Sequence, residues 1–411
     1  MPATAVVRPS QPIPQQSTPI TGPGYITSIG YLRAFVTLLV LAHHAALAYH
    51  PFAPQPPASL GAVPRWWQAF PVVDSQRSML AALFVGFNDT FFMALMFFLS
   101  GLFVWQSLKR KGTATFLRDR AVRLGLPFIA AAAVIAPLAY YPTYLQSRSA
   151  GGEAGFWHQW FSLGNWPSGP AWFIWVLLAF DVLTAAFLSL FPTWAYALGR
   201  FGAGADRRPS MFFVKLVLLS AIVYVPLAFL VNPLRWSTIG PFTFQTSRIL
   251  NYFLYFLIGA GVGVCRLDSG LLAPEGKLSR RWPLWCLGAL LAFGITSAVG
   301  IAALTTHLGS RSWEVASEFT FVLSCAASSL VFLSLFVRFA TKRNRVFDSI
   351  NRNAYGMYLI HYAFVSWLQY AVLKLSLPAI AKFSVVLIAT VLLSWGTTAL
   401  LRRVPAVARA I

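Results

Sequence analysis

The 411-residue sequence predicts an all-α integral membrane protein with about ten transmembrane helices and both termini in the cytoplasm. Two features of composition predict the class. Hydrophobic residues make up 57% of the chain, and charged residues make up 10%, against about 25% in soluble domains. A third feature, the uneven distribution of Lys and Arg between the apolar stretches, predicts the orientation. We therefore interpret the net charge of +21 as an orientation signal and expect no nucleic-acid partner.

The apolar stretches leave only short segments for other structure. Residues 1–24 are rich in Pro, Ser, Thr and Gln and lack a signal-peptide pattern, so we expect a disordered, uncleaved cytoplasmic tail. One membrane domain over 25–402 and a short basic cytoplasmic tail over 403–411 follow. The cysteines are odd in number and far apart, which favours core packing over a disulfide framework or a zinc site. They are Cys265, Cys286 and Cys325.

A bilayer core requires about 20 apolar residues per helix, and ten stretches of the chain fit this length. They are 26–48, 79–106, 124–145, 170–192, 211–231, 248–264, 283–304, 316–337, 354–375 and 383–401. Ten spans place both termini on one side. The connecting segments of that side carry 22 of the 32 Lys and Arg, and those of the opposite side carry 7. Because basic segments stay in the cytoplasm, we predict that the Pro- and Trp-rich loop 49–78 is extracytoplasmic and the bilayer is the chain's main partner.

The first span contains Arg33, His43 and His44, although a charge near the centre of a span costs roughly 2.5–3.5 kcal/mol. Eleven residues advance a helix by about 16 Å and return it to within about 20° of the same direction, so Arg33 and His44 share a face. An inner arginine suits a phosphate or carboxylate, and an outer histidine can act as a general base on a hydroxyl. Alternatively, Arg33 extends to the inner surface and His44 bonds a neighbouring carbonyl.

Three further sites carry polar groups in or beside spans. Ser100 and Gly101, within an aromatic run, predict close helix packing. Arg120 and Arg123 lie three residues apart at the expected start of the third span, so they share a face that suits a phosphate. The same two arginines also fit a simple orientation signal. His361 falls in the ninth span, where a lone histidine is more often structural than catalytic.

Four short motifs occur in order along the chain. They are Arg-x10-His at Arg33 and His44, aromatic-x-Leu-Ser-Gly at Phe97 to Gly101, Arg-x-x-Arg at Arg120 and Arg123 followed by Pro127, and Tyr-Gly-x-Tyr-Leu-Ile-His at Tyr355 to His361. With a Trp-rich span that carries Trp172 and Trp175, they resemble the acyltransferase-3 family of ten-span membrane acyltransferases over about residues 27 to 400. The early motifs look most like the branch that attaches succinyl groups to envelope glucans.

The resemblance implies transfer of an acetyl- or succinyl-class group from cytoplasmic acyl-CoA to a hydroxyl of an extracytoplasmic glycan, at a bacterial-type inner membrane. Acyl-CoA is then a donor substrate, and no bound cofactor is expected. His44 would be the general base, which contributes about 10²–10⁴-fold, and a covalent acyl-histidine stays open. The implied site residues are Arg33, Asp89 and His361 beside His44, then Arg120, Arg123 and Ser100 for the donor, and Trp172, Trp175 and Tyr358 for the substrate.

The carboxylates depart from the family pattern. Family members often carry an acid a few positions before the Ser-Gly pair, where this chain has Ala94 and the nearest acid is Asp89. We expect Asp89 to orient His44. The acid of the family's Trp-rich span corresponds loosely to Asp181. We expect His361, nearer the cytoplasm, to bind the donor or to take part in a relay.

Other classes of protein fit the sequence less well. No HxxxH, HExxH or Gly-x-Ser-x-Gly spacing occurs, which argues against a metal site and a serine hydrolase. A transporter or flippase also carries charges within spans, but we see no internal repeat. A structural partner in an envelope-synthesis complex is the third alternative. Tryptophans in the outer loops suit sugar stacking and the membrane interface equally: Trp66, Trp67, Trp157, Trp160 and Trp166.

Overall fold

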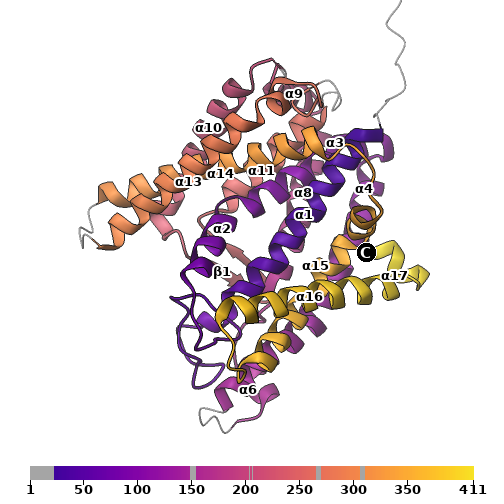
Figure 1. The fold of residues 1–411 in the computed structure, drawn as a ribbon. Coiled ribbons are helices and arrows are strands. Elements are labelled where there is room, and N and C mark those ends of the chain that lie inside the picture. Colours follow the sequence, from indigo (N-terminus) through magenta and orange to yellow (C-terminus); the bar gives the residue numbers. More distant parts are fainter. Residues whose placement is uncertain (1–22, 149–153, 203, 206, 265–269, 306–310) are drawn as a thin grey trace, which may run out of the picture.

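The computed structural model describes residues 23–148, 154–202, 204–205, 207–264, 270–305 and 311–411. Within these ranges the chain is mostly helical, as Figure 1 shows, which confirms the all-α class. Most of the expected tail 1–24 and Cys265 lie outside the described residues. The first helix already includes Pro23 and Gly24.

Each of the ten expected spans corresponds to helical chain. The matching helices are α1 (Pro23–Leu47), α2 (Met79–Gly101), α4 to α6, α8 (Trp172–Leu190), α10 (Pro209–Val231), α11 (Ile249–Val264), α13 (Trp282–Thr305), α14 (Arg311–Phe339), α15 (Arg345–Val372) and α16 (Ala379–Leu401). Among the described residues, eight stretches are long and apolar enough to cross a membrane. The two that fall short are α11, which has 16 residues, and α15, whose apolar part also contains polar side chains such as His361 and Gln369.

The third span is a helix with two irregular turns. It consists of α4 (Thr113–Arg120), α5 (Leu126–Ala130) and α6 (Ala136–Arg148), joined by the π-helical segments η2 (Ala121–Gly125) and η3 (Ala131–Ile135). A π segment inserts an extra residue per turn and rotates the side chains that follow it, and such segments are frequent at functional sites. Arg123 lies within the first of them.

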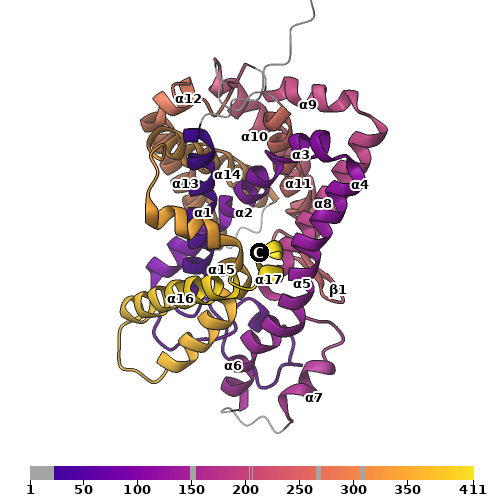
Figure 2. The same cartoon turned by 90° about the vertical axis from the view of Figure 1, so that its right-hand side faces the viewer.

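Shorter helices, 3-10 turns and one pair of strands connect or flank the long helices. They are α3 (Val104–Lys111), α7 (Phe156–Phe161), α9 (Thr193–Gly202), α12 (Lys277–Arg280), α17 (Pro405–Ala410), the 3-10 turns η1 (Trp66–Gln68) and η4 (Gly169–Ala171), and the strands β1 (Trp236–Ile239) and β2 (Phe242–Gln245). Figure 2 shows α3, α9 and α12 near one end and α6 and α7 near the other. We call the first the basic end, since it holds residues 109–123, and the second the loop end, since it holds residues 48–78.

α1 is the central helix of the bundle and contacts α2, α14, α15 and α16. It runs parallel to α15, because their polar contacts advance together along both helices. Tyr31 bonds Asp348 at 2.8 Å, and further along Gln369 donates to the carbonyl of Ala45 at 3.1 Å. Segments more than 300 residues apart in sequence thus share one interface.

Glycines let α2 and α11 approach closely. A Cβ at Gly101 would overlap the carbonyl oxygen of Phe256, and one at Gly259 would overlap that of Phe98. Small residues allow such backbone contact between membrane helices. The close packing expected from the Ser-Gly pair is therefore confirmed at Gly101.

Candidate functional site

His44 and His361 meet at the interface of α1 and α15. Nε2 of His361 lies 3.2 Å from Nδ1 of His44, and the two rings are 5.1 Å apart between centroids. His361 is fully buried, whereas His44 is half-buried. His361 therefore lies level with His44 along the two helices, whereas the sequence predicted a position nearer the start of its span.

Backbone carbonyls determine which nitrogen of each ring carries the proton. Nδ1 of His361 lies 2.6 Å from the carbonyl of Tyr358, and Nδ1 of His44 lies 2.8 Å from that of Val40. Since a carbonyl only accepts, both Nδ1 atoms are N–H donors in the neutral rings. Nε2 of His361 then accepts from Nδ1 of His44. Nε2 of His44 keeps its lone pair and bonds no other described residue, which is the form a general base requires.

Aromatic rings surround the pair on the loop-end side. Tyr362 contacts His44 edge-on at 5.1 Å and Tyr140 at 5.6 Å. The Tyr140 and Tyr362 hydroxyls both donate to the carbonyl of Gln68, at 2.9 and 3.3 Å. The loop of residues 48–78 is therefore attached directly to the walls of the histidine site.

Asp89 does not orient His44 in this structure, which corrects the expectation. Its carboxylate lies 2.8 Å from Nη2 of Arg248, and Arg248 also donates to the Asp89 carbonyl at 2.9 Å. The nearer histidine is His43, whose ring stacks on Phe92 at 5.0 Å and meets the His44 ring edge-on at 5.4 Å. His361 occupies the position beside His44 where we had expected a carboxylate.

Two arginines at the basic end lie close together. Arg123 is near enough to Arg33 for the two charges to repel, and both side chains are exposed. Nη2 of Arg33 donates to Oδ1 of Asn351 at 3.1 Å. Neither guanidinium forms an ion pair with a carboxylate of the described chain. Two adjacent cations without a counter-charge form an arrangement that binds phosphate groups.

Arg120 points elsewhere, although it was expected to share a face with Arg123. Its Nε lies 3.2 Å from Oδ2 of Asp181 on α8, and its guanidinium lies over Phe116 at 5.0 Å. Asp181 is 0% exposed. The π segment that begins at Ala121 turns Arg123 relative to Arg120, so one arginine faces Arg33 and the other connects α4 to α8.

The remaining expected site residues contact neighbouring elements. Trp172 packs on Trp236 at 5.4 Å, and the indole of Trp175 donates to the Thr243 carbonyl at 2.9 Å, so both attach α8 to the β-hairpin. The Tyr358 hydroxyl donates to the carbonyl of Pro170. The Ser100 hydroxyl donates a hydrogen bond of 2.8 Å to the Met96 carbonyl within its own helix.

Asn351 is a contact residue that sequence reasoning missed, and Tyr355 was named in a motif without a role. Asn351 binds Arg33, and the Tyr355 hydroxyl donates to the Arg123 carbonyl at 2.7 Å. A signal for Asn351 was present, because Asn344 caps α15 by accepting from the backbone N–H groups of Val346 and Phe347. An Asn N-cap predicts a helix start, which would have included Asn351 in the ninth span.

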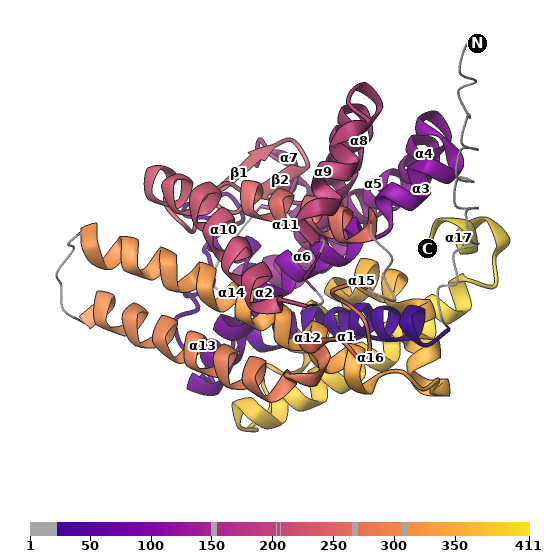
Figure 3. The same cartoon turned by 90° about the horizontal axis from the view of Figure 1, so that it is seen from above.

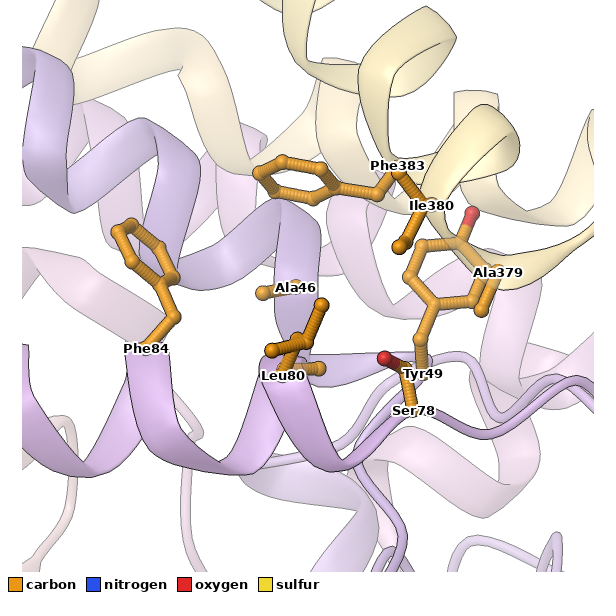
Figure 4. Close-up of a pocket in the computed structure, with 9 residues that line it drawn as sticks. Ala46, Tyr49, Ser78, Leu80, Phe84, Ala379, Ile380 and Phe383 are labelled. Atoms are coloured by element: carbon orange, nitrogen blue, oxygen red, sulfur yellow. The ribbon is translucent and has the colours of Figure 1, made fainter.

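A separate apolar pocket of about 260 Å³ lies at the loop end, between α1, α2 and α16. Figure 4 shows Phe84, Leu80, Ile380 and Phe383 around it, with Tyr49 at one side. Burial and the nearby Asp74 carboxylate raise the pKa of the Tyr49 phenol, so it stays protonated at neutral pH. No residue of the histidine or arginine clusters lines this pocket.

Comparison with known proteins places the chain by family alone. No curated protein and no solved structure matches the chain. A family model described as an acyltransferase domain matches residues 26–399, which include the His44–His361 pair and the Arg33–Arg123 pair. The protein is therefore a multi-pass membrane acyltransferase and belongs to the acyltransferase-3 family.

Proposed function

We propose that this membrane acyltransferase moves an acetyl- or succinyl-class group from cytoplasmic acyl-CoA to a hydroxyl of an extracytoplasmic glycan. The observation that carries the proposal is the contact between His44 and His361. It leaves a basic nitrogen on a half-buried ring whose other nitrogen is held by two acceptors. A base oriented by a third group is a recurring arrangement in acyl transfer.

His44 acts as the general base in this proposal. Its Nε2 takes the proton of the acceptor hydroxyl while the oxygen attacks the thioester carbonyl. The new C–O bond forms, the C–S bond breaks, and His44 returns the proton to the departing thiolate. His361 accepts a hydrogen bond from the His44 Nδ1–H throughout, so it stabilises the imidazolium that forms between the two proton transfers.

Arg33 and Arg123 bind the donor phosphates in this proposal. Two guanidiniums that pair with no carboxylate of the described residues give charge-assisted hydrogen bonds to phosphate oxygens, and the phosphate in turn relieves their mutual repulsion. Asn351 fixes the Arg33 side chain at 3.1 Å. Arg33 and His44 lie on one face of α1, about 16 Å apart along the axis, so a donor bound at the basic end extends along α1 toward the histidines.

The acceptor approaches from the loop end. Trp66 and Trp157 are exposed there, and their rings can stack on the apolar faces of sugars, which supports a glycan acceptor such as an envelope glucan. Trp67 and Trp160, by contrast, are buried in the core of this region. We place the loop end outside a bacterial-type inner membrane, because the basic end carries most of the Lys and Arg.

The decisive experiment is mass spectrometry of envelope glycans from cells that lack the protein and are re-supplied with wild type or His44→Gln. We expect an added acyl mass with wild type and a loss of about 10²–10⁴-fold in transfer rate with the variant. Equal membrane levels of both proteins are the control. Acylation at the wild-type rate in the His44 variant would refute the base. Glycans that never differ from those of the deletion strain would refute the glycan acceptor.

A further inference from the structure

A second groove, remote from the histidine site, opens at the basic end between α10, α13 and α14. It has a volume of about 420 Å³. Leu323 and Ala327 of α14 form its floor, and α13 forms one wall along Leu284, Gly288, Leu291 and Ile295. Figure 3 shows α13 beside α14, projecting from the rest of the molecule. Only 11% of the apolar window of α13 is buried, so this helix faces lipid along most of its length.

The groove has a polar mouth. Arg281 and Ser210 line it where α13 and α10 begin, and Arg281 is exposed. The acidic residue near Arg281 does not form an ion pair with it. Glu275, the nearby acid, pairs instead with Arg280 at 3.3 Å and with Arg338 at 3.5 Å. Within the described chain, Arg281 forms no ion pair. Its guanidinium therefore lies at the mouth of an apolar groove without a carboxylate partner among the described residues.

Trp285 supplies a second polar group just inside the mouth. Its ring contacts Phe213 of α10 edge-on at 5.7 Å, which joins the two walls. Its indole N–H is buried and bonds no group of the described residues. A buried donor without a partner is costly, so a ligand that brings an acceptor to this depth is favoured.

We propose that this groove binds an anionic glycerophospholipid. The phosphate binds Arg281 and Ser210, an ester carbonyl accepts from the Trp285 N–H, and one acyl chain lies along α13 past Gly288. From Gly288 to Ile295 the wall extends about 10 Å, which accommodates the upper part of a chain. Basic pockets between transmembrane helices on the cytoplasmic side select anionic head groups in this way. The site is independent of the acyl-transfer chemistry.

The chain offers a matched pair of substitutions for the test. A Cβ at Gly288 meets no atom within 4 Å, so the position has room for a side chain, and Gly288→Leu directs that side chain into the groove. Gly294 on the same helix is equally open but does not line the groove, so Gly294→Leu is the control. Arg281→Gln removes the charge, and Arg281→Lys retains it.

Native mass spectrometry of the full-length protein, titrated with phosphatidylglycerol or phosphatidylcholine, measures the binding. We expect selective retention of phosphatidylglycerol, loss of binding in Gly288→Leu, and wild-type binding in Gly294→Leu. Loss of one cation near the lipid surface predicts about fivefold weaker binding in Arg281→Gln, with recovery in Arg281→Lys. Equal retention of both lipids, or equal binding by the two leucine variants, would overturn the proposal. If Gly288→Leu does not fold, the two Arg281 variants decide it: equal affinities would refute the site.

Discussion

The proton position on a histidine depends on what its second ring nitrogen contacts, and here that contact is another histidine. Removing His361 leaves Nδ1 of His44 with the Val40 carbonyl alone, so the ring loses the acceptor that stabilises its charged form. We expect His361→Leu to lower kcat by about 10–100-fold, as loss of an orienting partner does, with little change in the donor KM. Steady-state kinetics on purified protein measure both constants.

A second substitution distinguishes a positioning role of His361 from a purely structural one. His361→Gln keeps an oxygen that can accept from His44, so it should recover part of the lost kcat, whereas a merely structural role would make both variants equally unstable. Thermal unfolding of the two variants is the control. A rise in donor KM with unchanged kcat would instead assign His361 to donor binding.

Arg120 and Arg123 look equivalent in sequence but have different partners. Arg120→Gln leaves Asp181 buried without a counter-charge, which costs about 3 kcal/mol. We expect a lower unfolding temperature in Arg120→Gln and its recovery in the double variant Arg120→Gln/Asp181→Asn. Arg123→Gln should leave the unfolding temperature unchanged and raise the donor KM.

The double variant separates two roles for Arg120. If it regains stability and also turnover, Arg120 serves the fold and Arg123 serves the donor. A double variant that is stable but still has a raised donor KM would show that Arg120 binds the donor, as the sequence predicts. The sequence could not distinguish the two arginines, because an i, i+3 spacing implies one face only in a regular helix, and η2 is π-helical.

Close packing of α2 on α11 depends on glycine at the contact. Gly101→Ala would push the Phe256 backbone, and overpacking of this kind costs about 1–3 kcal/mol. Gly86→Ala on the same helix is the matched control, since no atom lies within 4 Å of that Cβ. Thermal unfolding in detergent should show a lower midpoint for Gly101→Ala alone. Equal midpoints would mean that the close contact between α2 and α11 does not contribute to stability.

At the scale of single elements, the sequence predicts where helices lie better than how they begin. Apolar length predicts ten stretches, and each of them is helical in the structure, because lipid imposes that length directly. It misses the first turns of α15, which are polar and are marked only by the Asn344 cap. It also misses the hairpin of β1 and β2, where Gly240 has a positive φ of 57° and allows a tight turn.

At the scale of the whole molecule, a buried ion pair attaches the loop of residues 48–78 to the helix bundle. Lys382 of α16 binds Asp74 of that loop at 2.7 Å, and both side chains are 1% exposed. Removing one partner of a buried pair costs about 3–5 kcal/mol. We expect Lys382→Met to release the loop, which limited proteolysis between residues 49 and 78 would detect as faster cleavage. Lys382→Met/Asp74→Leu should restore most of the resistance, and cleavage as fast as in the single variant would contradict this account.

Helix pairing at this scale lies beyond what hydrophobic patterning can predict. Every span is apolar, so each can contact lipid or protein equally well. The hydrophobic periodicity of a span therefore does not indicate which other span it packs against. The choice of partner depends on sparse polar contacts, such as Tyr31 with Asp348 and Gln369 with the Ala45 carbonyl. For this reason the motifs predicted that Arg33, His44 and His361 matter, while the contact between the two histidines had to come from the structure.

The parallel packing of α1 and α15 has a consequence for synthesis of the protein. The two histidines are separated by 317 residues, so at about 5–20 residues per second the ribosome adds the second roughly 15–60 s after the first. During that interval α1 stays in the bilayer with Arg33 and His44 lacking their final partners. The contact between the two histidines forms only when the ninth span packs against α1. Any chain that stops before α15 is therefore a membrane protein without this histidine pair.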